Sequence, residues 1–369
     1  MTVPVYLILG FHSHQPVGNF DFVFEETTQK AYLPLLLALK NHPKIRVSLH
    51  YTGILHQWLK NHHPEISPII QELVNRNQVE MMTGGFYEPI LSVIPDNDKQ
   101  GQIRKQTEFI YHHTGTHPKG FWLAERVWEP QLASYLVDAG ISYTVTDDSH
   151  FRSAGLQENE TWGYYLTEDQ GKTLAVFPIS EKLRYTIPFQ KVEDTLDYLN
   201  HVRNNHQGIP VVVMADDGEK FGGWPGTYDH CYTDGWLENF FTALEKNADW
   251  IHLITFQECL KMVKPLGKIY LPTASYTEMM EWAMPVQAIL QYDSLVEDLK
   301  QKDIYRKNKS FIRGGFWRNF LAKYPESNQL HKKMLRVSHK VSQLTESAIS
   351  TSQLDLIKDY LYAGQTNCG

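Results

Sequence analysis

Two acidic segments contain the residue types that acid–base chemistry requires. Glu125 lies in GFWLAERVWEP (120–130), and Asp216 and Asp217 lie in MADDGEKFGGWP (214–225). Each segment follows an apolar run and continues into a tryptophan and a proline. Two carboxylates facing each other across an aromatic pocket suit glycoside chemistry, in which one attacks or stabilises the anomeric carbon while the other protonates the leaving oxygen. Glu125 and Asp217 are therefore the candidate catalytic pair.

An ordinary ion pair is the alternative interpretation of each carboxylate, because structural ion networks imitate active sites. Adjacent residues on a strand point to opposite faces, so Arg126 is expected to be a poor partner for Glu125. The same alternation predicts that only one of Asp216 and Asp217 points inward. The spacing alone leaves both interpretations open.

A second constellation consists of histidines and aspartates at strand ends. His12, His14, Asp147, Asp148 and His150 are ligand types for a divalent ion, and His-x-His places two imidazoles on one face of a strand. A deacetylase-like barrel hydrolase uses such chemistry. Alternatively, these groups hydrogen-bond sugar hydroxyls or one another, and no HExxH motif or cysteine cluster reinforces a metal site.

Aromatic residues are numerous: 9 Trp, 20 Tyr and 17 Phe, many of them beside Gly, Asp, Glu or His. Rings next to polar groups suit hydroxylated ligands, whose C–H faces stack on the ring while their hydroxyls reach the carboxylates. Filling a large core is the competing role for any single ring.

Short, nearly continuous apolar runs alternate with segments of helical spacing. We predict strands at 5–12, 45–53, 79–85, 120–125, 141–148, 173–179, 211–217 and 251–256, and helices at 96–113 and 192–206. Polar and aromatic residues follow successive strands, as in HSHQP, GGFYEP, ERVWEP and DDGEKFGGWP. That distribution favours the mouth of a β/α barrel over the single switch point of an open sheet.

The sequence changes character after about residue 272. From 286 to 362 it is mostly charged, amphipathic helix, interrupted at 311–328 by an aromatic loop or short helix. We therefore expect a catalytic barrel over 1–272 and a helical subdomain packed on it over 273–369.

Bulk composition excludes several classes of protein. A net charge of −7 with interspersed signs argues against binding to nucleic acid or to an anionic membrane. Three cysteines without ligand-like spacing fit a reducing cytoplasm, and the apolar N-terminus indicates a first buried strand rather than a signal peptide. No segment approaches the roughly 20 apolar residues of a membrane span.

Several long motifs together resemble glycoside hydrolase family 57, most closely its 4-α-glucanotransferase branch. They are HSHQP, VEMMTGGFYEP, GFWLAERVWEP, MADDGEKFGGWPGTY and YLPTASYTEMMEWAMP, and the resemblance runs from Val5 to about Cys368. It implies a (β/α)7 barrel followed by a helical subdomain, and a retaining double displacement on α-1,4-glucans or maltooligosaccharides. It also implies no cofactor and no catalytic metal.

The resemblance also assigns roles to individual residues. It makes Glu125 the nucleophile and Asp217 the general acid/base, with Asp216 a source of the raised pKa that the acid needs. Trp122 is expected to pack in the core. The substrate-binding residues implied are His12, His14, Glu80, Trp128, Asp216, Trp224 and Trp282.

The sequence departs from the family pattern in two places. Ala215 stands where close relatives often have a histidine, which removes a hydrogen-bond donor beside the acid. The chain stops at YAGQTNCG, where a fifth motif should begin, and the family's C-terminal β-rich domain is missing, as in a truncated product or a natural short form. An α-amylase, a glucan-binding protein inactivated by truncation, and a metal-dependent hydrolase are the alternatives, and a homo-oligomer stays open.

Overall fold

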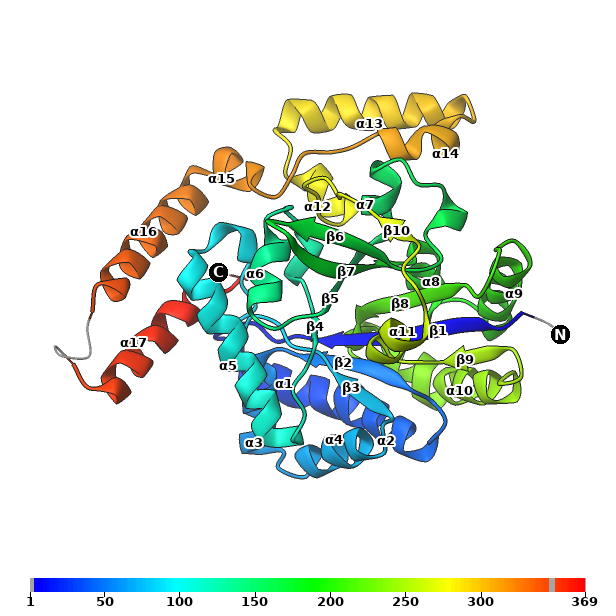
Figure 1. The fold of residues 1–369 in the computed structure, drawn as a ribbon, viewed down its shortest axis with the longest axis horizontal. Helices are drawn as coiled ribbons and strands as arrows, with labels where there is room; N and C mark the ends of the chain where they lie inside the picture. The colour runs from blue at the N-terminus through cyan, green and yellow to red at the C-terminus, as the bar shows by residue number, and fades with distance from the viewer. Residues whose placement is uncertain (1–2, 345–348, 369) are drawn as a thin grey trace.

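Seven parallel strands form a closed ring in the part of the chain that the computed structural model describes, residues 3–344 and 349–368. In ring order they are β1 (Val5–Ser13), β2 (Val47–Tyr51), β3 (Val79–Met81), β4 (Gly120–Phe121), β5 (Tyr143–Asp147), β7 (Lys172–Ile179) and β8 (Val211–Asp217). A parallel bridge between Thr83 and Phe121 joins the β3 side to β4, and β8 pairs with β1. The predicted (β/α)7 barrel is confirmed (Figure 1).

All eight predicted strands are present, but the eighth lies outside the ring. β9 (Ile251–Leu253) pairs with the beginning of β1, below the point where β2 joins that strand. The sequence reading missed β6 (Tyr165–Asp169), which forms an antiparallel hairpin with β7, and the short β10 (Gly267–Lys268). Gln170 and Gly171 form the two-residue turn of the hairpin, both with positive φ, as tight hairpins require.

Helices surround the ring and cover its outer face (Figure 1). The predicted helices at 96–113 and 192–206 are confirmed as α5 (Asp96–Thr114) and α9 (Val192–Asn204). The other helices up to the end of the barrel are α1 (Asp21–Thr27), α2 (Leu33–Asn41), α3 (Gly53–His62), α4 (Ile66–Asn75), α6 (Leu132–Asp138), α7 (Asp148–Ser153), α8 (Glu181–Thr186), α10 (Trp236–Lys246) and α11 (Phe256–Met262).

Strand alternation divides the core into an outer and an inner layer. On β8, Val212 and Met214 belong to the cluster packed under the surrounding helices, whereas Val213 and Ala215 belong to a cluster inside the barrel. Because side chains alternate along a strand, Asp217 continues the inner set beyond Ala215. The inner residues thus lead directly to the carboxyl-terminal mouth.

The remaining helices lie beside the barrel. They are α12 (Thr277–Trp282), α13 (Val286–Gln301), α14 (Tyr305–Asn308), α15 (Asn319–Lys323), α16 (Pro325–Ser342) and α17 (Thr351–Ala363). The aromatic stretch at 311–328 contains α15 and the beginning of α16. Residues 345–348 of the predicted helical stretch, and 1–2 and 369 at the ends, lie outside the described residues. The division at residue 272 stays a prediction.

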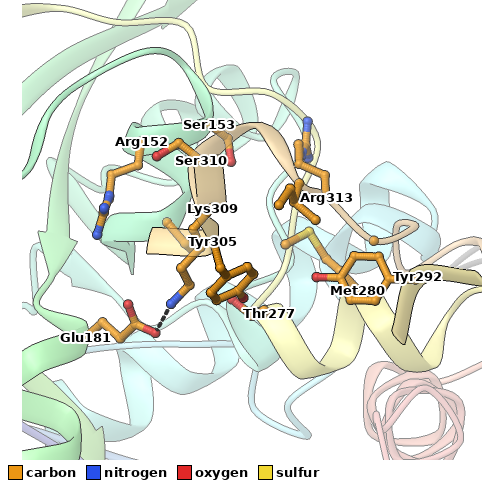
Figure 2. Close-up of a pocket in the computed structure, with 13 residues that line it drawn as sticks. Arg152, Ser153, Glu181, Thr277, Met280, Tyr292, Tyr305, Lys309, Ser310 and Arg313 are labelled. Atoms are coloured by element: carbon orange, nitrogen blue, oxygen red, sulfur yellow. Dashed lines mark hydrogen bonds and ion pairs between the residues drawn. The ribbon is translucent and has the colours of Figure 1, made fainter. Parts of the chain in front are cut away.

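Helices α13 and α14 and the segment after them meet α7 and α12 around a small cavity (Figure 2). There Lys309 forms an ion pair of 2.5 Å with Glu181 at the first turn of α8. In the described part of the chain, no helix combines the length and the apolar character that a bilayer crossing needs.

Candidate active site

A cleft of about 630 Å³ lies at the carboxyl-terminal end of the barrel strands, within the size range of small-molecule sites. It brings together residues from β1, β8, the turn after β4 and the segments around α8 and α12. The predicted site residues that line it are His12, His14, Glu125, Asp216, Asp217, Trp224 and Trp282.

Glu125 sits in a strained turn beyond the end of β4. Glu125 and Arg126 have φ values of 54° and 49°, in the left-handed region that non-glycine residues rarely adopt. Because this turn is not a strand, the expected alternation fails, and both side chains line the cleft. The expectation that Arg126 points to the opposite face was therefore wrong. Backbone strain of this kind concentrates at functional sites.

The environment of Glu125 favours its neutral form. Burial raises the pKa of Glu125, the nearby charges of Glu88 and Asp217 raise it further, and Arg126 opposes the shift. Asn367, from the segment after α17, donates a hydrogen bond from Nδ2 to Oε1 of Glu125 at 3.3 Å. The charge of Asp217 in the same cleft thus contributes to the raised pKa of Glu125.

A buried glutamate joins the two histidines of the HSHQP motif. Glu88, itself at a positive φ of 49°, contacts Nε2 of His12 at 3.0 Å through one carboxylate oxygen and Nδ1 of His14 through the other. Burial opposes a charge on the imidazoles, but Glu88 prevails and raises the pKa of His12, and raises the pKa of His14 to about 11. The cluster is therefore held together by charge.

The residues proposed for a metal site do not come together as one set. His12, His14 and Glu88 offer ligand atoms within 4.8 Å of one another, a geometry that could hold a divalent ion. Asp147 instead accepts from Arg184, and His150 Nε2 lies 3.1 Å from the carbonyl oxygen of Arg126. The single five-residue metal constellation was therefore wrong.

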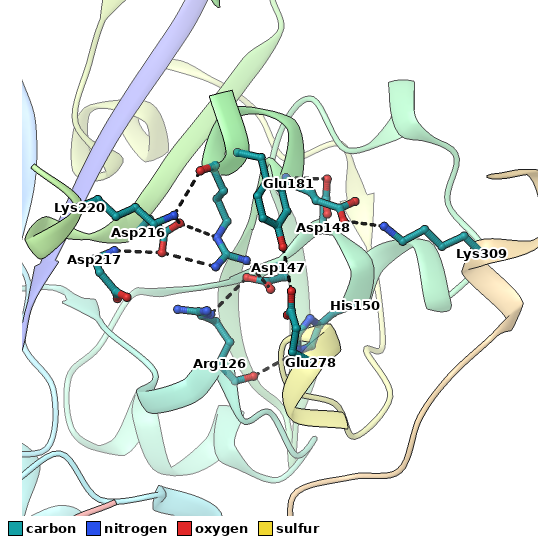
Figure 3. Close-up of polar contacts among 12 residues, drawn as sticks. Arg126, Asp147, Asp148, His150, Glu181, Asp216, Asp217, Lys220, Glu278 and Lys309 are labelled. Carbon is teal, nitrogen blue, oxygen red and sulfur yellow. Dashed lines mark hydrogen bonds and ion pairs between the residues drawn. The ribbon is translucent and has the colours of Figure 1, made fainter. Parts of the chain in front are cut away.

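A chain of buried ion pairs supports the aspartates on the opposite wall (Figure 3). Arg184 donates from Nε to Asp216 at 2.8 Å and from Nη1 to Asp147 at 3.1 Å. Lys220 pairs with Asp216, and Arg126 Nε lies 3.3 Å from Asp147. The chain therefore connects the neighbour of Glu125 to the neighbour of Asp217.

The carboxylate of Asp216, next to the candidate acid Asp217, forms ion pairs with two cations. Burial opposes its ionisation, but Arg184 and Lys220 overcome that effect and lower the pKa of Asp216 well below its ordinary value. Two cations offset the negative charge of Asp216, and the expectation that Asp216 raises the pKa of the acid stays a prediction. Its carboxylate also accepts from the backbone N–H of Asp217 at 3.0 Å, which fixes the end of β8.

Ala215 lies one layer below Asp217, inside the barrel. Its side chain is buried and faces Gly10 of β1, where an added Cβ would come within 3.0 Å of the Ala215 methyl group. Position 215 is therefore tightly packed.

Two predicted substrate-binding residues do not reach the cleft. Trp128 is fully buried in the barrel-side core, and its Nε1 donates to the carbonyl oxygen of Leu271 at 3.3 Å. Glu80 is buried under hydrogen bonds from Tyr143 and from the backbone N–H of Gln257. As arranged here, both residues stabilise the barrel, which corrects their expected contact with substrate. Conversely, Trp122 packs in the core as expected but also borders the cleft, stacked on His12 at 4.6 Å.

The sequence reading missed several residues that line the cleft. Glu219 and Lys220 could have been found, because they belong to the quoted DDGEKFG motif. Glu219 accepts from the hydroxyl of Tyr32 at 2.6 Å and from the backbone N–H of His14 at 2.9 Å. Glu88, Tyr276 and Glu278 could also have been found, because they belong to the motifs VEMMTGGFYEP and YLPTASYTEMMEWAMP. Arg184, Tyr185 and Phe189 lie in a segment without a recognisable pattern. The full missed set is Glu88, Arg184, Tyr185, Phe189, Glu219, Lys220, Tyr276, Glu278 and Cys368.

Most of the chain matches known protein families. Residues 8–272 match the family model of glycosyl hydrolase family 57, and residues 315–369 match the model of the alpha-amylase/4-alpha-glucanotransferase middle domain. Alpha-amylase 1 of Dictyoglomus thermophilum is 46% identical over 367 residues, which is 100% of this chain and 53% of that protein. The 4-alpha-glucanotransferase of Thermococcus litoralis is 44% identical over 343 residues, 93% of this chain and 52% of that protein.

The crystal structure of the Thermococcus litoralis 4-alpha-glucanotransferase superimposes with a TM-score of 0.92 at 42% identity, covering 99% of this chain and 55% of that chain. A branching enzyme of the same family from Pyrococcus horikoshii, at 14% identity and a TM-score of 0.63, shares the fold. The chain spans about half the length of the curated relatives it matches.

Proposed function

The chain belongs to glycosyl hydrolase family 57, and on that premise we propose that it is a retaining 4-α-glucanotransferase acting on α-1,4-glucans and maltooligosaccharides. The observation that carries the proposal is that Glu125 and Asp217 line one cleft, which Trp224 and Trp282 flank with exposed rings. Carboxylates and aromatic faces are what glycoside transfer requires.

In the proposed mechanism, Asp217 protonates the glycosidic oxygen while ionised Glu125 attacks C1. The C1–O bond breaks, the leaving sugar departs with the proton of Asp217, and a covalent glycosyl ester forms on Glu125. Asp217 then removes a proton from the acceptor hydroxyl, which attacks C1 and releases Glu125. Another glucan as acceptor gives transfer, and water gives hydrolysis.

Other residues of the cleft are assigned supporting roles. His12, His14 and Trp224 would bind the substrate, and Asp216 would act through its contacts, because its carboxylate is occupied by Arg184 and Lys220. Arg126 keeps the pKa of Glu125 from rising further, which favours the ionised nucleophile.

Hydrolysis of α-1,4-glucans is the second candidate, because relatives of similar identity are named alpha-amylase. The balance between the two activities depends on how well acceptor sugars compete with water. Exposed rings on two sides of the cleft, Trp224 at 40% and Trp282 at 53%, favour retention of an acceptor.

Incubation with maltotriose tests the proposal. Transfer yields glucose and a ladder of longer maltooligosaccharides, whereas glucose and maltose alone would move the assignment to an amylase. We expect Glu125→Gln to lower kcat at least about a thousandfold, because the covalent step is lost. Asp197→Asn on the outer helix α9, an exposed carboxylate outside the cleft, should match the parent.

Two outcomes would redirect the proposal. Binding of oligosaccharide without turnover, unchanged in Glu125→Gln, would indicate a glucan-binding protein. Activity that a chelator removes and a divalent ion restores would instead indicate a metal-dependent hydrolase. A cytoplasmic location and a homo-oligomeric state remain predictions, which cell fractionation and light scattering can check.

A further inference from the structure

An apolar groove of about 700 Å³ runs along the helical region next to the catalytic cleft. We call it the distal groove; its walls are residues 90–94 after β3, the end of α12, one face of α15 and α16, and residues 360–367. None of these residues belongs to the candidate acid–base pair.

Polar contacts fix the walls of the distal groove to the barrel. Arg318 donates two hydrogen bonds to the carboxylate of Glu129 in the ERVWEP motif, at 2.6 and 3.0 Å. His331 Nε2 lies 2.8 Å from the carbonyl oxygen of Val93, and Ser338 donates to Asp98 at 2.6 Å. A bidentate arginine–carboxylate pair fixes the relative orientation of its two side chains. These contacts therefore hold the walls of the groove in position.

One wall of the groove is a ladder of aromatic rings. Trp317 and Phe320 have ring centroids 6.0 Å apart, and Phe320 and Tyr324 follow at 6.3 Å with nearly parallel planes. Tyr324 is 45% exposed, and Tyr360 across the groove is 74% exposed. The exposed rings of Tyr324 and Tyr360 offer faces on which sugar C–H groups stack.

The distal groove adjoins the catalytic cleft. Trp282 and the segment that carries Asn367 and Cys368 border both spaces. At this junction the buried atoms Oγ1 of Thr366 and Oδ1 of Asn367 have no hydrogen-bond partner among the described residues. Buried polar atoms usually have partners, so these two atoms lack hydrogen bonds that such atoms normally make.

We propose that the distal groove is an extended binding site for an α-1,4-glucan chain, which it holds beyond the sugars bound in the cleft. The aromatic ladder supplies stacking surfaces, and Thr366 and Asn367 bind hydroxyls where the chain passes from cleft to groove. The site rests on the proposed function, because its occupant is the substrate of the cleft. It predicts that long glucans bind more tightly than short ones.

Binding measured in a Glu125→Gln background, which prevents turnover, tests the site. Dissociation constants of maltotriose and maltoheptaose are obtained by isothermal titration calorimetry. Tyr324→Ala and Tyr360→Ala each remove an exposed ring and should weaken maltoheptaose binding about threefold to tenfold, while leaving maltotriose binding unchanged. Phe311→Ala is the matched control, because Phe311 is 79% exposed and lines neither space.

The outcomes separate the groove from the proposed function. Binding of both sugars without any difference among the variants overturns the groove, as does an equal loss for maltotriose and maltoheptaose. Failure of Glu125→Gln to bind any maltooligosaccharide contradicts the proposed function, and the groove with it. A dimer that Tyr324→Ala dissociates in light scattering would show that a second copy occupies the groove, which also overturns the proposal.

Discussion

The two walls of the cleft are built in different ways. On the wall of Glu125, the backbone itself is strained, with Glu88, Glu125 and Arg126 all in the left-handed region. On the wall of Asp217, the backbone is a regular strand, and a chain of ion pairs through Asp216 fixes its end. Strained turns place the side chains of the first wall, whereas the second wall is a regular strand whose end is fixed by ion pairs.

From this difference we predict which groups matter for stability and which for activity. The ion-pair chain is buried, so breaking it leaves unpaired charges in the protein interior. The cluster around Glu88 borders the cleft, so disturbing it changes how His12 and His14 meet a ligand. We therefore expect the ion-pair chain behind Asp217 to govern mainly folding and the cluster around Glu88 to govern mainly catalysis.

Arg184→Met should give the largest effect on stability. Arg184 bridges Asp147 and Asp216, and its removal leaves both carboxylates with fewer partners, so we expect a loss of about 3–5 kcal/mol in the free energy of unfolding. Chemical denaturation measures the loss. Arg184→Lys should recover only part of it, because an ammonium lacks the forked geometry. If Arg184→Met were as stable as the parent, the ion-pair chain would not be the main source of stability at this wall of the cleft.

Glu88→Gln should affect activity more than stability. An amide has one acceptor oxygen in place of two, so one of His12 and His14 loses its partner and its position. We expect kcat/KM for maltotriose to fall about tenfold to a hundredfold, as misplacement of binding groups commonly causes. Glu88→Asp, which keeps the charge, is the comparison. A loss of stability with intact kcat/KM would place Glu88 in the same class as Arg184.

Asp148→Asn should give a smaller, pH-dependent gain in stability. Burial raises the pKa of Asp148 to about 7, the nearby Glu181 adds to the shift, and one carboxyl oxygen has no partner among the described residues. Because the folded-state pKa lies above the unfolded value, the native state loses stability as pH rises from about 4 to about 7. We expect Asp148→Asn to be more stable than the parent by about 2 kcal/mol at pH 8.

The difference between Asp148→Asn and the parent should vanish near pH 4, where both proteins are neutral at this position. Paired denaturation curves at the two pH values measure it. A gain that is the same at pH 4 and pH 8 would show that packing, not the charge of Asp148, causes it.

Residue patterns alone predicted much of the architecture. Continuous apolar runs located the ring strands, because a strand covered on both faces must be apolar throughout. Helical spacing located α5 and α9 nearly to the residue. The hairpin of β6 was missed because its charged, half-exposed residues lack that apolar signal.

At the site, local patterns were enough to identify carboxylates at strand ends, including Glu125 and Asp217. Their surroundings could be seen only in the folded chain, where strand alternation fails at the turn of Glu125 and Trp128 is buried in the core. Glu88, Arg184 and Asn367 come from distant segments, and their contacts depend on how the ring closes and the helices pack. Local patterns specify which face a residue occupies, whereas partners far apart in the chain are specified only by the folded whole.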